Sequence, residues 1–95
     1  MANLNSEVMR FARIYSIMIE GTETDERGFF ITFEVLAKSP EEAIGLITSS
    51  DEVKNIANSK IEEIEEKGIS LRRLFASNPE ILHQTGRAYF DLDPV

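Results

Sequence analysis

The segment of residues 29–38 alternates strictly between two rows of side chains, and it constrains the fold more than any other part of the chain. One row is apolar throughout: Phe29, Ile31, Phe33, Val35 and Ala37. The other row is mixed: Phe30, Thr32, Glu34, Leu36 and Lys38. Successive side chains of a strand point to opposite faces, so this pattern predicts a strand with one row in the core. The mixed row begins apolar and becomes amphipathic, so we expect a sheet buried on one face, with Glu34 and Lys38 in water.

A helix is expected to begin directly after this strand. Ser39 supplies a hydroxyl that can cap a free N–H, Pro40 suits the first helical position, and Glu42 completes a capping box. The apolar residues that follow at helical spacing form one face: Ala43, Ile44 and Ile47. Ser49 and Glu52 repeat the capping pattern, so either a new helix begins there or the first continues with a kink.

The segment before residue 29 supplies a natural partner for the strand. Residues 11–20 are rich in aromatic and β-branched types and end at Gly21, which predicts a strand. Residues 22–28 contain turn formers and no aliphatic residue, and they are predicted to form the loop of a hairpin. A helix over residues 5–18 stays open as an alternative, because apolar residues also recur there at helical spacing: Leu4, Val8, Phe11, Tyr15 and Met18.

Residues 60–66 fit two different elements. Ile61 and Ile64 extend a helical stripe that begins at Val53, and this periodicity slightly favours a helix ending near Gly68. The need for a third strand favours an edge strand instead, with its glutamates on the solvent side. Both alternatives stay open at this point.

The rest of the chain predicts two short helical segments and a closing strand. Apolar residues within 69–75 have the spacing of one helical turn. An Asn-Pro pair opens a second short helix over residues 78–86, which a glycine closes, and His83 would lie in its last turn. Residues 87–93 alternate between apolar and polar types and predict a strand.

This order of elements is typical of an α+β domain. Helices would pack on one face of an antiparallel sheet, in a ferredoxin-like or related split arrangement. At 10.8 kDa the chain has enough material for one hydrophobic core but not for two. We therefore expect residues 1–95 to form a single small domain.

Charge and composition exclude several classes of protein. The net charge is -7, and the one basic segment, residues 67–87, carries only four bases against one acid. Binding to nucleic acid or to anionic membranes gains affinity from Lys and Arg, so neither is expected. The absence of cysteine excludes a disulfide scaffold, a thiolate zinc site and a cysteine nucleophile. No leader pattern and no long apolar stretch are present, which predicts a cytoplasmic location.

The ionisable residues form no catalytic constellation. His83 has no nucleophile or second ligand type near it in the sequence, and we interpret it as structural or incidental. Asp91 and Asp93 share one face of the closing strand with Tyr89, as residues on the wet face of any strand would. The glycines form no phosphate-binding loop. We therefore predict no catalytic residue, no cofactor and no metal site.

The densest charged cluster places four carboxylates within five positions: Glu62, Glu63, Glu65 and Glu66. On a regular element they would not converge on a cation, but their potential would attract a basic protein. The favoured function is a non-catalytic acidic protein-binding module, of the immunity-protein, antitoxin or inhibitor type, in which these glutamates bind a basic protein partner. One alternative is a ligand-binding domain or small enzyme with a pocket between the sheet and residues 69–87. Another is a structural subunit that forms a homo-oligomer through its sheet edges.

Overall fold

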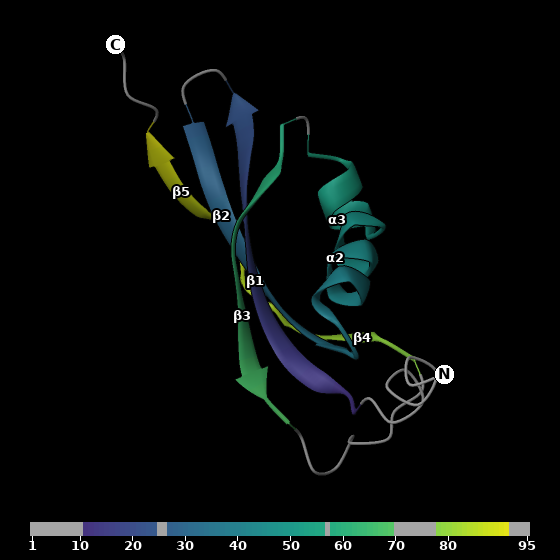
Figure 1. Cartoon of the computed structure of the whole chain (residues 1–95). Coiled ribbons are helices and arrows are strands. Elements are labelled where there is room, and N and C mark those ends of the chain that lie inside the picture. The colour runs from purple at the N-terminus through teal and green to yellow at the C-terminus, as the bar shows by residue number, and fades with distance from the viewer. Residues whose placement is uncertain (1–10, 25–26, 57, 70–77, 92–95) are drawn as a thin grey trace.

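The computed structural model describes residues 11–24, 27–56, 58–69 and 78–91, and its strands form one antiparallel sheet. The elements in chain order are β1 (Arg13–Thr24), β2 (Arg27–Ala37), α2 (Pro40–Thr48), α3 (Asp51–Lys54), β3 (Lys60–Gly68), β4 (Glu80–Gln84) and β5 (Ala88–Asp91). The sheet order is β3-β1-β2-β4, and β5 also pairs with β2. Both helices lie against the same face of this sheet (Figure 1). The prediction of a small α+β arrangement with an antiparallel sheet is confirmed.

The long hairpin of β1 and β2 is the centre of the sheet. The two strands pair from Arg13 opposite Ala37 to Thr24 opposite Arg27. The strand predicted over residues 11–20 is confirmed from Arg13 onward, and the helical alternative is wrong over residues 13–18. Residues 1–10 lie outside the described part of the chain. The predicted loop over residues 22–28 was too long, because both strands continue into it.

Two glycines that suggested this longer loop serve a different purpose. A Cβ atom at Gly21 would lie 2.7 Å from Cζ of Phe29, and one at Gly28 would lie 2.5 Å from Cζ of Phe90. Each glycine therefore makes room for the aromatic ring of the residue opposite it on the neighbouring strand. Neither has a positive φ.

The hydrophobic core lies between the sheet and the helices, as the alternation of residues 29–37 predicted. The buried residues come from one row of each central strand and from the helical segment: Tyr15, Ile17, Ile19, Phe29, Ile31, Phe33, Val35, Ala37, Ala43, Ile47, Val53 and Ile56. On the opposite face Phe30 stacks on Phe90 with ring centroids 4.9 Å apart. Leu36 on that face is only 1% exposed, and Glu34 and Lys38, which were expected in water, are half-buried.

The helix boundaries follow the predicted caps closely. Ser39 Oγ accepts a hydrogen bond from the Glu42 N–H at 3.1 Å, and Glu42 Oε1 accepts one from the Lys38 N–H at 2.8 Å. The second start is a new helix rather than a kink. Its cap is Ser50, whose Oγ accepts from the Val53 N–H at 3.4 Å, one residue later than predicted.

Residues 60–68 form a strand, so the helix that periodicity slightly favoured is wrong. β3 pairs antiparallel with β1. β2 and β3 are therefore parallel, with β1 between them, and the connection crosses over β1 through α2 and α3. The second edge of β1 needs hydrogen-bond partners, and only a distant part of the chain supplies them.

The helix predicted over residues 78–86 is also wrong, because β4 is a strand. β4 pairs with Phe33–Leu36 of β2, and β5 pairs with Arg27–Phe30 along the same edge. Thr85 bridges the interruption: its N–H donates to Thr32 O at 2.9 Å, and its Oγ1 accepts from the Thr32 N–H at 3.0 Å. The closing strand predicted over residues 87–93 is confirmed over 88–91, whereas the helical turn predicted over 69–75 lies almost entirely outside the described residues.

Candidate functional site

Strand β3 combines the predicted glutamates with an open sheet edge. One edge of β3 pairs with β1, and no other described strand pairs with β3. Lys60 to Lys67 are all exposed. An edge strand of this kind presents unpaired N–H and C=O groups to solvent or to a partner. We call Lys60–Gly68 the acidic edge.

The register with β1 explains why this strand looked helical. Ile64 lies opposite Ile17 and Ile61 lies opposite Ile19, so both isoleucines face the helix side. Three positions separate them, but a register shift between Met18 and Ile19 absorbs the extra residue at Glu62. This β-bulge lets residues at helical spacing share one face of a strand. Each isoleucine is 37% exposed.

The same register distributes the four glutamates over both faces. Glu63 lies opposite Met18 and Glu65 lies opposite Ser16, on the face away from the helices. Glu66 lies opposite Tyr15, on the helix side, and Glu62 lies at the bulge. The carboxylates therefore share one strand but do not line a single side of it, and they do not converge. Among the described residues, no group of three or more His, Asp or Glu side chains could hold a metal ion.

The described cations near the acidic edge pair with three of these glutamates. Lys60 Nζ lies 3.9 Å from Glu62 and 3.5 Å from Glu20, and Lys67 Nζ lies 3.7 Å from Glu65. Arg13 Nε lies 3.6 Å from Glu66 Oε2. No described cation forms an ion pair with Glu63. Exposed pairs of this kind contribute little free energy, so a partner's cations could replace them at low cost.

A small hollow lies beside the start of the acidic edge. It encloses about 310 Å³ and is lined by Glu20, Thr22, Asn58, Ser59 and Lys60. All five lining residues are of polar or charged types. This hollow is not at the pocket predicted between the sheet and residues 69–87, and residues 70–77 lie outside the described chain.

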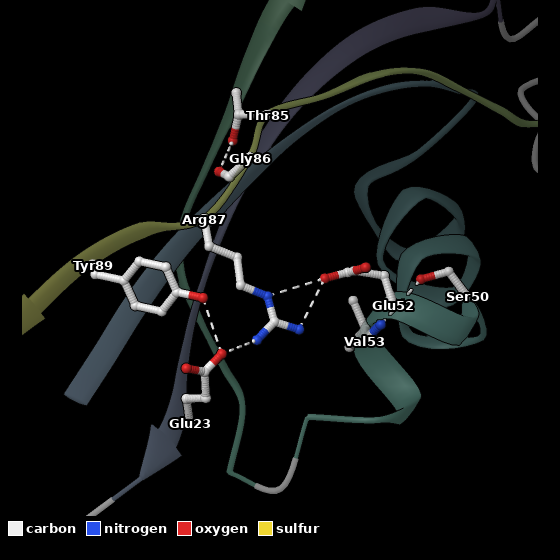
Figure 2. A network of polar contacts seen from close by, with 8 residues as sticks. All are labelled: Glu23, Ser50, Glu52, Val53, Thr85, Gly86, Arg87 and Tyr89. Carbon is white, nitrogen blue, oxygen red and sulfur yellow. Dashed lines mark hydrogen bonds and ion pairs between the residues drawn. The ribbon is translucent and has the colours of Figure 1, made fainter. Parts of the chain in front are cut away.

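A second polar cluster is centred on Arg87 and joins three elements (Figure 2). Arg87 Nη1 donates to Glu23 Oε2 at 3.0 Å, and its Nη2 and Nε donate to Glu52 Oε2 at 3.1 and 3.3 Å. Tyr89 Oη donates to the same Glu23 oxygen at 2.9 Å. The Arg87 guanidinium also lies 4.2 Å from the centroid of the Phe29 ring. We call these contacts the Arg87 clamp.

The Arg87 clamp is a structural connection between the end of β1, α3 and the start of β5. Burial lowers the pKa of Arg87, but its hydrogen bond with Glu52 and the attraction of that carboxylate outweigh this and raise the pKa. The guanidinium therefore stays charged. Sequence reasoning missed the clamp because Arg87 is 35 residues from Glu52 and 64 from Glu23, so no local pattern marks it.

The other predicted residues are dispersed. His83 is exposed on β4 opposite Glu34, so it does not complete a helix as expected. Tyr89 lies opposite Phe29, with ring centroids 5.9 Å apart, and thus on the helix side rather than on a fully wet face. Asp93 lies outside the described residues.

No family model matches the chain, and no curated protein or solved structure is significantly similar to it. None of the helices in the described ranges is long and apolar enough to cross a membrane. Function therefore has to be inferred from the residues and their arrangement.

Proposed function

We propose that this protein is a non-catalytic binding module that recognises a basic protein through the acidic edge, in the manner of an immunity protein, an antitoxin or an enzyme inhibitor. The observation that carries the proposal is that four glutamates and two lysines lie exposed along a strand whose outer edge pairs with no described strand. A basic partner could therefore reach the side chains and the backbone of the same segment.

The charge of the whole chain supports the same kind of partner. A net charge of -7 creates a field that speeds the approach of a cationic protein. Within the acidic edge, Glu63 has no described ion-pair partner, and the pairs of Glu62, Glu65 and Glu66 are exposed. Exposed charges of this kind act mainly on the association rate and on its salt dependence.

The experiment compares two charge-reversed variants of equal net charge. A lysine-rich peptide serves as the probe, and its association rate is measured against ionic strength. Glu63→Lys with Glu66→Lys should slow association by about tenfold or more at low salt and flatten its salt dependence. The control, Glu41→Lys with Asp51→Lys, reverses exposed acids on the helices and should have a much smaller effect. Equal losses in the two variants would refute the acidic edge as the site.

For the fold we propose a relative of the ferredoxin-like arrangement rather than that arrangement itself. The support is the crossover from β2 to β3, which passes over β1 through α2 and α3 and so resembles a split βαβ unit. A ferredoxin-like chain has a helix after its first strand, whereas β1 here leads directly into β2.

A further inference from the structure

We infer that the basic partner binds as an added β-strand along the acidic edge, with apolar side chains on the helix side and lysines or arginines on the other face. This inference rests on the proposed function and specifies how that partner binds. It names a main-chain interaction, which charge attraction alone would not require.

The backbone of the acidic edge provides the hydrogen-bonding surface. β3 has nine residues, which corresponds to about 30 Å of extended chain. Its inner edge pairs with β1, so its outer N–H and C=O groups need water or another strand. An added strand satisfies these groups, and the side-chain pattern then sets specificity.

The side chains define the pattern of the added strand. Ile61 and Ile64 lie on the helix side and are each 37% exposed, although the residues opposite them in β1 are buried. Apolar side chains of a neighbouring strand would cover them and extend the core. Glu63 and Glu65 lie on the other face, where cationic side chains of the same strand would meet them. The complementary segment therefore alternates apolar and basic residues.

A second copy of this chain fits the same edge less well than a basic strand does. Antiparallel self-pairing centred on Ile64 places Glu62 opposite Glu66 and Glu63 opposite Glu65. A shift of one residue places Glu62 opposite Glu65 in one direction and Glu63 opposite Glu66 in the other. Parallel pairing in register places each glutamate beside its own copy. Like charges directly opposite each other destabilise a sheet. The glutamates thus disfavour self-association while leaving the edge open to a basic strand.

The probe is an eight-residue peptide of alternating lysine and valine in which the valine amides are N-methylated. One of its edges can still form hydrogen bonds, and the blocked edge prevents the peptide from aggregating. A first control has every amide methylated, with unchanged charge, and a second replaces the lysines by glutamates. Affinity is measured by calorimetry, and amide exchange in the protein is followed by NMR.

The probe should bind about tenfold or more tightly than either control. In its presence, those amides of residues 61–67 that point away from β1 should exchange about tenfold more slowly. Strand addition would be refuted if the probe and the fully methylated control bound equally well and neither bound the variant with Glu63→Lys and Glu66→Lys. The proposed function would still stand in that case. Protection elsewhere in the sheet would also refute strand addition. No binding of either basic peptide at low salt would overturn both proposals, and a peptide-free dimer protected at residues 61–67 would show that a second copy occupies the edge.

Discussion

Replacement of Gly21 by alanine should destabilise this protein, although alanine is ordinarily the better residue inside a strand. A Cβ atom at Gly21 would lie 2.7 Å from Ile56 Cγ2 and 2.7 Å from Phe29 Cζ. Phe29 is 1% exposed and Ile56 is 8% exposed, so neither side chain can swing into solvent. The φ of Gly21 is not positive, so the backbone itself accepts alanine. The steric contact alone decides the sign.

The magnitude follows from two opposing contributions. Loss of glycine from the unfolded chain stabilises the folded state by about 0.4–1 kcal/mol. Overpacking of a buried site costs about 1–3 kcal/mol, and two buried neighbours closer than 3.0 Å place Gly21 toward the upper end. The net loss is about 1–2.5 kcal/mol, which lowers Tm by roughly 5–15 °C for a chain of this length.

The assay is thermal and urea unfolding, with Gly45→Ala as the matched control. Nothing lies within 4 Å of a Cβ atom at Gly45, which is in the middle of α2. That variant should be more stable by up to about 1 kcal/mol. Phe29→Leu removes the ring atoms that the new methyl group meets, so Gly21→Ala should cost less in that background. A Tm that rises in both single variants would refute the steric explanation.

Three further predictions concern the side chains of Ser39, Arg87 and His83. Ser39→Ala should lower the free energy of unfolding, measured in urea, by about 1 kcal/mol, because the Glu42 N–H loses its acceptor. An unchanged urea midpoint would contradict the cap. Arg87→Met keeps an unbranched apolar side chain but removes the guanidinium that lies over Phe29 and binds Glu52, and it should cost about 1 kcal/mol. A double-mutant cycle with Glu52→Gln that gave no coupling would contradict the clamp. His83→Gln should change stability by less than about 1 kcal/mol and leave probe binding unchanged; a tenfold change in affinity would show that His83 takes part in binding.

Local patterns predicted the elements whose determinants are local. The row from Phe29 to Ala37 is buried because alternation places it on one face, and the helix begins after Ser39 because its hydroxyl meets a backbone N–H three residues away. Both interactions lie within a few residues in the sequence. They can therefore be recognised without knowledge of the rest of the fold.

Sequence reasoning was wrong or undecided where distant strands determine the structure. β4 occupies residues that an Asn-Pro pair and a glycine mark as a helix, because the edge of β2 is available to pair with it. β3 was ambiguous because the bulge at Glu62 gives Ile61 and Ile64 a helical spacing on one face of a strand. The positions of the four glutamates on two faces depend on that same bulge, which no local pattern reveals.

The interruption between β4 and β5, which only Thr85 bridges among the described residues, divides the outer edge of β2 into two zones that can fray separately. β5 covers only Arg27–Phe30, and the Thr32–Thr85 contacts that separate it from β4 are exposed. Local opening proceeds in contiguous cooperative units, so β5 can detach while β4 stays paired. Such an opening would break the Phe30–Phe90 stack and expose the backbone of β2 at Arg27–Phe30. Exposure of this edge of β2 to a foreign strand therefore depends on the pairing of Ala88–Asp91 and on the Arg87 clamp at the start of β5.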